Sequence, residues 1–271
     1  GIDWALTRGA SGLRTLAQRY DLVLAYAPTL RGLPHNAVRG EGLGKVVVVL
    51  DEPPPFTQPR SALDDAQRVG ACSRCVYAHF KLADSRVRHF APPYEEERFL
   101  PYVQSRHQHS SRVHATQPFY FMAKRSLHAE ALEGVMLGLR YARSERENWR
   151  FRGEMTYDAY LHRLAACRWV LALDLKVSAG QVIAEAAMLG VPVISVVGKT
   201  NAELVLPPEL LLPRNVAAAQ AAAIVNRTVA WYDARPHEYR KLSARVRASA
   251  VGMFAPPDRA ALMQTMSECC P

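Results

Sequence analysis

The feature of this sequence that most limits its fold is an alternation of short apolar runs with amphipathic stretches. One apolar run covers residues 21–27 and a second covers residues 45–50, and each ends at a proline-containing turn. Short runs of this kind, apolar almost throughout, are typical of strands buried on both faces of a parallel sheet. Residues 11–20 and 61–69 have the apolar spacing of helices. Strand and helix therefore alternate from the start of the chain.

The same alternation continues along the sequence, which predicts an α/β protein. Further strands are predicted at residues 71–78, 86–90, 118–123, 149–152, 169–173 and 191–197. Further helices are predicted at residues 128–141, 157–166, 180–189, 216–231, 236–250 and 257–267. Strands separated by helices form parallel sheets through right-handed crossovers. The polar, His-rich stretch 104–117 is interpreted as a linker between two such sheets.

Length and composition exclude several protein classes. The chain has 271 residues, of which 49% are hydrophobic and 22% charged, and this excludes disordered and fibrous proteins. No apolar stretch approaches the roughly 18 to 20 residues that span a bilayer. The first residues show no charged segment followed by an apolar one, so we expect a cytoplasmic protein without a secretion signal.

The cysteines give a second indication of the compartment. There are five, and only Cys72 and Cys75 have the spacing of metal ligands. No second pair of Cys or His at a matching interval completes a set of four zinc ligands. We therefore expect free thiols in a reducing compartment rather than a zinc site.

The charge of the chain is strongly positive. Its formal net charge is +9, and more than half of the excess lies in residues 101–170. A basic surface favours anionic partners such as nucleotides, nucleic acid or phospholipid. A solvated arginine-rich surface accounts for the same composition, so both interpretations stand at this point.

The segment from residue 174 to residue 195 is the strongest candidate for chemistry. A strand is predicted to end at Leu173, and a short loop leads into a helix that begins near Gly180. The backbone N–H groups of residues 178–181 would face an anion there, and Gly180 would let phosphate oxygens approach the backbone. Glu185, within an apolar part of that helix, would accept hydrogen bonds from sugar hydroxyls. A solvent-facing Glu on an ordinary helix fits the same pattern.

Residues 178–194 resemble the nucleotide-sugar signature of GT-B glycosyltransferases, in the group with a glycogen-synthase-like carboxyl-terminal domain. Residues 87–99 resemble the end of the amino-terminal domain of those enzymes, and residues 119–125 resemble the first strand of their donor domain. The resemblance covers about residues 85–200. It implies two Rossmann-like parallel-sheet domains facing across a cleft. The expected parts are an abbreviated acceptor-side domain (1–104), a donor-binding domain (105–250) and a carboxyl-terminal helix (251–271).

The resemblance also implies an activity, the transfer of a sugar from a nucleotide sugar such as a UDP-sugar to an acceptor hydroxyl. In that family the second Glu of a Glu-x7-Glu pair binds the donor ribose, and Glu185 matches it. Val177 stands at the position of the first Glu. This departure argues against a retaining mechanism, because the missing carboxylate helps to position the transferred sugar.

A clamp on the donor diphosphate is the other implied part of the site. Lys124 or Arg125 matches its first basic residue, and Lys199 or Lys176 is a candidate for the second. Such cations would stabilise the leaving diphosphate, so no cofactor is expected beyond the donor and no metal site is required. The predicted donor-binding residues are Lys124, Arg125, Ser178, Ala179, Gly180, Gln181, Glu185 and Lys199.

A general base is expected on the acceptor side. Ligands of open α/β sheets bind at the carboxyl ends of the strands, and Asp51 and Glu52 follow the strand at residues 45–50. Either carboxylate would deprotonate an acceptor hydroxyl in an inverting displacement. An acidic turn before Pro53 is the alternative interpretation. His35 is the next candidate base.

The acceptor is predicted from charge. A helix end presents a row of arginines for an anionic acceptor, namely Arg140, Arg143, Arg146 and Arg150. This resembles the bacteriophage GT-B enzymes that glucosylate hydroxymethylated pyrimidines in duplex DNA, which must pull a base from the stack. A glycan or lipid-linked sugar is the alternative acceptor. A non-catalytic nucleotide-sugar or nucleic-acid binding module is the alternative function, and an epimerase is disfavoured because it needs further acidic groups around the sugar.

Overall fold

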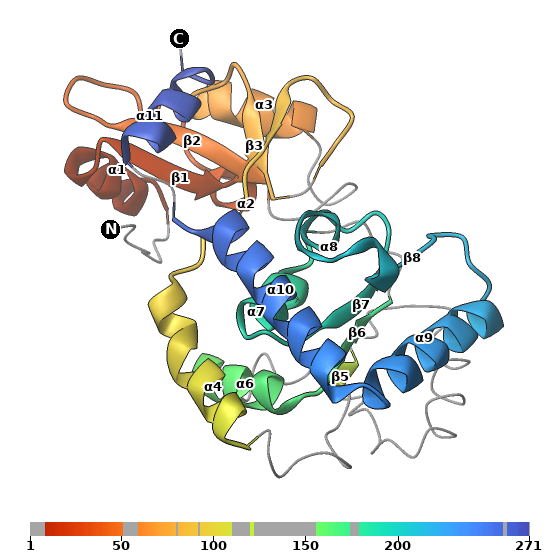
Figure 1. Cartoon of the computed structure of the whole chain (residues 1–271). Helices are drawn as coiled ribbons and strands as arrows, with labels where there is room; N and C mark the ends of the chain where they lie inside the picture. Colours follow the sequence, from red (N-terminus) through yellow and green to blue (C-terminus); the bar gives the residue numbers. More distant parts are fainter. Residues whose placement is uncertain are drawn as a thin grey trace. The chain divides into compact units, whose positions relative to one another are not determined.

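A computed structural model of the chain describes most of its residues. The described residues are 9–50, 59–79, 81–91, 93–109, 120–121, 156–173, 179–256 and 259–270. The chain forms two compact units (Figure 1). Unit 1 consists of Gly1–Pro93 together with Pro256–Pro271, and unit 2 consists of Tyr94–Ala255. No helix in the described ranges is long and apolar enough to cross a membrane.

Unit 1 is built on a four-stranded parallel sheet. Its strands, in spatial order, are β1 (Leu22–Tyr26), β2 (Lys45–Leu50), β3 (Val76–Ala78) and β4 (Val87–His89). Its helices are α1 (Gly9–Arg19), α2 (Ala27–Leu30), α3 (Pro59–Val69) and α11 (Arg259–Ser267). The strands confirm the prediction of a parallel sheet in this half of the chain. The short helix α2 was not predicted.

Both faces of the unit 1 sheet are covered, which explains why β2 is apolar from Val46 to Leu50. On one face, Val46 and Val48 pack in a core with buried residues of α1 and α3. On the other face, Val47 and Val49 pack in a core with Met266 of α11. Successive side chains of a strand point to opposite faces, so a strand covered twice requires an unbroken apolar run.

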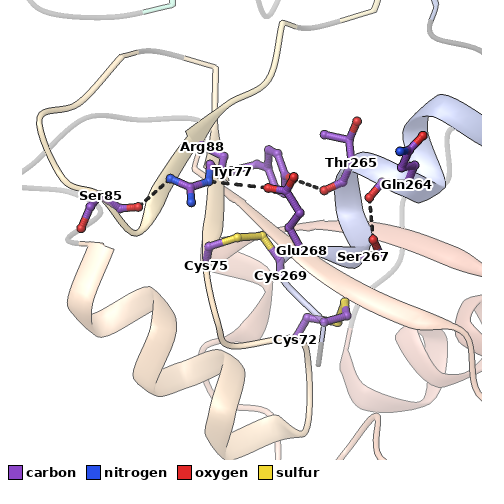
Figure 2. Close-up of a disulfide and its surroundings, with 11 residues drawn as sticks. Cys72, Cys75, Tyr77, Ser85, Arg88, Gln264, Thr265, Ser267, Glu268 and Cys269 are labelled. Carbon is purple, nitrogen blue, oxygen red and sulfur yellow. Dashed lines mark hydrogen bonds and ion pairs between the residues drawn. A yellow bond between two sulfur atoms is a disulfide. The ribbon is translucent and has the colours of Figure 1, made fainter.

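Two disulfides attach the chain end after α11 to the segment before β3. Cys72 is bonded to Cys270 and Cys75 to Cys269, and Figure 2 shows the second of these bridges beside the hydroxyl of Tyr77. That hydroxyl donates a hydrogen bond of 2.7 Å to the backbone carbonyl of Thr265 in α11. The carboxyl-terminal helix is therefore a covalently fixed part of unit 1.

The prediction of free thiols is thus wrong for four of the five cysteines, and Cys167 is the free one. The bonded partners are separated by 198 and 194 residues, so no local spacing reveals them. Disulfides form and persist in oxidising environments. The pairing removes the cysteine-based reason for expecting a reducing compartment.

Unit 2 is built on a second parallel sheet. Its strands, in spatial order, are β5 (Tyr120–Phe121), β6 (Val170–Ala172), β7 (Val193–Val196) and β8 (Leu211–Leu212). Its described helices are α4 (Glu96–His109), α6 (Tyr157–Ala166), α7 (Gln181–Met188), α8 (Thr200–Val205), α9 (Ala218–Asp233), α10 (Pro236–Phe254) and the 3-10 turn Pro208–Leu210. The predicted strands near β5, β6 and β7 are confirmed, whereas β8 and α8 were not predicted. The strand predicted at 149–152 and the helix predicted at 128–141 lie outside the described residues.

Helix α4 corrects part of the predicted linker. The sequence analysis assigned residues 104–117 to a linker, but α4 runs through to His109. Pro101 inside the helix hid the helical pattern, since proline removes a backbone hydrogen bond. Burial of Phe99 and Tyr102 holds the helix nevertheless. The expected domain boundary at residue 104 falls inside α4, and α11 joins unit 1 rather than standing apart.

Helix α7 occupies the centre of unit 2. Its residues from Val182 to Met188 are all buried, and α10 packs against both α7 and α8 (Figure 1). The hydroxyl of Ser243 in α10 donates a hydrogen bond to the carbonyl of Gly190, the residue at which the chain turns from α7 toward β7. These contacts hold α7, the turn at Gly190 and α8 against α10.

Candidate functional site

Buried polar side chains gather in one segment of unit 2. Among the described residues, six polar or charged residues are buried, and five of them lie between residues 185 and 201. The five are Glu185, Ser195, Lys199, Thr200 and Asn201. A buried polar group costs free energy unless it has a partner, so such a concentration within an apolar sheet and its helices marks a candidate functional site.

A glycine turn begins this segment. Gly180 is the N-cap of α7 and has a φ of 76°, in the left-handed region that favours glycine. A Cβ at this position would lie 2.9 Å from Cδ1 of Ile183, so a side chain here would displace the end of the Ile183 side chain. No side chain caps the helix start at Gly180. The amino-terminal end of α7 therefore presents backbone N–H groups, and this is the end predicted to bind a phosphate group.

Asn201 ties the glycine turn to α8. Its backbone N–H donates a 3.0 Å hydrogen bond to the carbonyl of Ala179, and its side-chain Nδ2 donates one of 3.3 Å to the carbonyl of Gly180. Asn201 is fully buried, so both bonds form away from water, where they are strongest. The turn is consequently fixed before any ligand binds.

Glu185 lies within α7, and its carboxylate faces helix α6. The side chain is 6% exposed. The hydroxyl of Tyr160 donates a 2.7 Å hydrogen bond to Oε2 of Glu185, and that of Tyr157 donates a 3.1 Å hydrogen bond to Oε1. Each carboxylate oxygen thus accepts one phenol, and Glu185 is not the solvent-facing residue of the alternative interpretation.

The environment keeps the Tyr157 phenol protonated. Burial raises the pKa of Tyr157 above its usual value of 10.0, and the negative charge of Glu185 and its hydrogen bond raise it further. The Arg98 guanidinium stacks over the Tyr157 ring at 4.4 Å from the ring centroid and acts in the opposite direction. The phenol is therefore a dependable hydrogen-bond donor to the carboxylate at neutral pH.

Lys199 lies at the start of α8. It is 2% exposed and follows the turn after β7. Glu203 closes the same turn, because its Oε1 accepts a 2.7 Å hydrogen bond from the backbone N–H of Gly198. Since Asn201 bonds to the glycine turn, the start of α8 and the start of α7 form one local structure.

The structure brings together part of the predicted donor site. Ala179, Gly180 and Gln181 form the turn at the start of α7, with Ala179 buried and Gln181 exposed. Glu185 and Lys199 belong to the buried polar group described above. Apart from His35, the other predicted site residues lie outside the described residues, namely Asp51, Glu52, Lys124, Arg125, Ser178, Arg140, Arg143, Arg146 and Arg150.

Unit 1 holds the sixth buried polar residue. His79 follows β3, its Nδ1 is 2.8 Å from the carbonyl of Phe90, and its Nε2 is 3.2 Å from the hydroxyl of Tyr26 at the end of β1. His35, the alternative base, lies in an exposed turn between α2 and β2. His79 rather than His35 is thus the buried histidine at the carboxyl edge of this sheet, and the sequence analysis did not single it out.

Three functional candidates were missed from the sequence. Tyr157 and Tyr160 are spaced three residues apart on a predicted helix, a spacing that places both on one face. That spacing predicts that the two phenols lie side by side, but it does not indicate that Glu185 is their hydrogen-bond partner. Asn201 gave no local signal, because its bonds go to a turn about twenty residues earlier in the chain.

Comparison with known proteins supports the fold. Models of protein families give no match to the chain, and neither do curated protein sequences. Solved structures do match. The Anabaena HepE structure in complex with UDP and glucose has a TM-score of 0.61 and 15% identity, over 96% of this chain and 80% of that one.

Two other solved structures are similar. The sucrose-phosphate synthase of Thermosynechococcus elongatus has a TM-score of 0.56 and 15% identity, over 96% of this chain and 75% of that one. A structure described as trehalose-6-phosphate from E. coli, bound with UDP-2-fluoro glucose, has a TM-score of 0.58 and 12% identity over the same shares. These neighbours are GT-B glycosyltransferases, and the chain has the GT-B fold.

Proposed function

We propose that the chain is a glycosyltransferase that transfers a sugar from a nucleotide sugar, tested first as a UDP-sugar, to an acceptor hydroxyl. The observation that carries the proposal is the buried carboxylate of Glu185, placed on α7 directly after the glycine turn at Gly180. Solved structures of the same fold hold UDP with glucose and UDP-2-fluoro glucose. The carboxylate would accept hydrogen bonds from the ribose hydroxyls of such a donor, and the backbone turn at the start of the same helix would bind its diphosphate.

The roles of the residues follow from the charges that change. The acceptor oxygen bonds to C1 of the sugar, the bond from C1 to the diphosphate breaks, and its electron pair leaves on the diphosphate. Backbone N–H groups of the turn at residues 179–181 and the Lys199 ammonium would stabilise that negative charge without a metal ion. Asp51 or Glu52 would take the acceptor proton in an inverting displacement.

For the acceptor we propose a hydroxymethylated pyrimidine in duplex DNA. The support is the net charge of +9 and the run of arginines from Arg140 to Arg150. A glycan or a lipid-linked sugar is the other acceptor class that a basic protein of this fold would serve. A screen of nucleotide sugars against both acceptor classes, with products identified by mass, separates them.

One observation favours a second candidate function. Val177 stands where the resembling family has its first Glu, so the residue that positions the transferred sugar is absent. A non-catalytic nucleotide-sugar binding module would keep Glu185 and lose that residue. Binding of UDP-sugars without transfer to any acceptor and without slow donor hydrolysis would support this candidate.

Calorimetric titration with UDP tests the donor site. Glu185→Gln keeps the size of the side chain but replaces one acceptor oxygen by an NH2 group, so we expect a loss of about 1 to 3 kcal/mol in UDP binding. Glu209→Gln is the matched control, because Glu209 makes an exposed ion pair with Arg245 elsewhere in unit 2. Equal UDP affinity in Glu185→Gln and wild type would contradict the assignment of Glu185.

A further inference from the structure

The carboxylate of Glu185 is held by a pair of phenols. Tyr157 and Tyr160 lie one turn apart on α6, and their rings stack with centroids 5.9 Å apart. Each donates to a different oxygen of Glu185, at 3.1 and 2.7 Å. The pair fixes the plane in which the two oxygens lie.

Helix α6 is itself fixed, so the two phenols cannot follow a moving carboxylate. The hydroxyl of Tyr102 in α4 donates a 3.0 Å hydrogen bond to Oδ1 of Asp158, and its ring makes an edge contact with His162 at 4.6 Å. Arg98 of α4 covers the Tyr157 ring. Helix α4 therefore holds α6 on both sides of the tyrosine pair.

We propose that Tyr157 and Tyr160 are positioning residues that prepare Glu185 to accept the ribose hydroxyls of a nucleoside diphosphate, an inference that rests on the proposed function. Two phenol donors restrict the torsions of the carboxylate before the ligand arrives. A carboxylate with a fixed plane is the acceptor that two adjacent ribose hydroxyls require.

A purely structural role for the tyrosines predicts a different result. If the phenols only tie α6 to α7, their loss changes the binding of every ligand of unit 2 alike. If they position Glu185, their loss is felt only by ligands that carry ribose hydroxyls. A nucleotide without those hydroxyls distinguishes the two roles, because it keeps the base and the diphosphate.

The experiment is a calorimetric comparison of UDP with 2′,3′-dideoxyuridine diphosphate, using the whole chain. We expect wild type to prefer UDP, and Tyr160→Phe and Tyr157→Phe each to weaken UDP binding roughly tenfold, since a hydrogen bond to a charged group is lost. Binding of the dideoxy nucleotide should stay within about twofold of wild type, because no ribose hydroxyl couples it to Glu185.

Tyr77→Phe is the matched control. It removes a phenol hydrogen bond of 2.7 Å in unit 1, to the carbonyl of Thr265, and should leave the ratio of the two affinities unchanged. Equal losses for both nucleotides in Tyr160→Phe, or no loss for either, would overturn the positioning role. Absence of UDP binding by wild type would overturn the proposed function itself, so the two failures are distinguishable.

Discussion

A buried carboxylate held by two phenols dominates the chemistry of unit 2 at the scale of single residues. Glu185 is 6% exposed, and a charge at such a depth is tolerated only with partners that satisfy its oxygens. Tyr157 and Tyr160 satisfy one oxygen each. The same bonds that satisfy the buried carboxylate also orient it.

Tyr157 provides a prediction in alkaline solution. Its pKa is raised in the folded state, first by burial and then by Glu185, so the folded chain binds this proton more tightly than the unfolded chain. The resulting stability is complete below the ordinary phenol pKa of about 10 and is lost as the pH rises above it. We expect the free energy of unfolding of wild type to fall more steeply above about pH 10 than that of Tyr157→Phe.

Denaturant unfolding at a series of pH values measures this difference. Because all other phenols are shared by the two proteins, their titration cancels in the comparison. Parallel pH dependences for wild type and Tyr157→Phe would show that the Tyr157 phenol is not coupled to folding.

At the scale of elements, the start of α7 depends on a residue without a side chain. The substitution Gly180→Ala puts a side chain on a residue whose φ of 76° is left-handed. The new Cβ would also lie 2.9 Å from Cδ1 of Ile183. We expect a loss of about 1 to 3 kcal/mol in unfolding free energy and weaker UDP binding, because alanine strains the left-handed backbone of the turn.

Gly252→Ala is the matched control for that substitution. Gly252 lies in α10, and nothing lies within 4 Å of a Cβ built on it. Alanine in a helix interior is more favourable than glycine by roughly 0.5 to 1 kcal/mol, so this variant should gain stability. Thermal unfolding of the two variants should thus move in opposite directions, and similar shifts would refute the role given to the Gly180 turn.

The attachment of α11 is the second prediction at this scale. Cys269→Ser combined with Cys270→Ser removes both bridges, and loss of a native disulfide typically costs about 2 to 5 kcal/mol. We expect a lower unfolding temperature and faster hydrogen exchange in Arg259–Ser267. Cys167→Ser, which changes the free buried thiol, leaves both bridges in place.

Peptide mapping of the oxidised protein checks the pairing directly. It should find Cys72 linked to Cys270 and Cys75 linked to Cys269. Unchanged exchange of α11 in the doubly substituted protein would mean that packing against Val47 and Val49 holds the helix without the bridges.

At the scale of the whole molecule, the chain leaves unit 1 after Pro93 and returns to it at Pro256. Unit 1 is therefore completed by residues 256–271, and the sheet face formed by Val47 and Val49 is covered by α11, which follows unit 2 in the chain. This arrangement makes the carboxyl-terminal segment essential for a complete core, although its sequence resembles an appended helix.

The net charge of the molecule gives the prediction for its acceptor. If duplex DNA is the acceptor, affinity should fall with salt at a log–log slope of about −0.9 for each phosphate neutralised. Arg140→Ala, Arg143→Ala and Arg146→Ala should each flatten the slope by about one unit without selecting among sequences. If binding to duplex DNA is undetectable at about 50 mM salt, or if its affinity does not change with salt concentration, a glycan or a lipid-linked sugar is favoured as the acceptor instead.

Local patterns were sufficient for the elements that depend on neighbours in sequence. The alternation of apolar runs and amphipathic stretches predicted both parallel sheets, because strands such as β2 are covered on both faces and are apolar wherever they are buried. The turn at Gly180 was predicted for a related reason, since a backbone turn at a helix start needs glycine at a particular position. The resemblance to GT-B enzymes placed Glu185 on that helix, and the structure puts it there.

Only the tertiary structure decided which distant residues meet. The cysteines pair across 194 and 198 residues, Glu185 meets two phenols on another helix, and Asn201 bonds back to the turn at Gly180. Such contacts depend on how sheets and helices stack, and a period of 2 or 3.6 residues carries no record of a partner on another element. The sequence by itself therefore determined the elements and the glycine turn, while packing determined the disulfides, the environment of Glu185 and the unit to which α11 belongs.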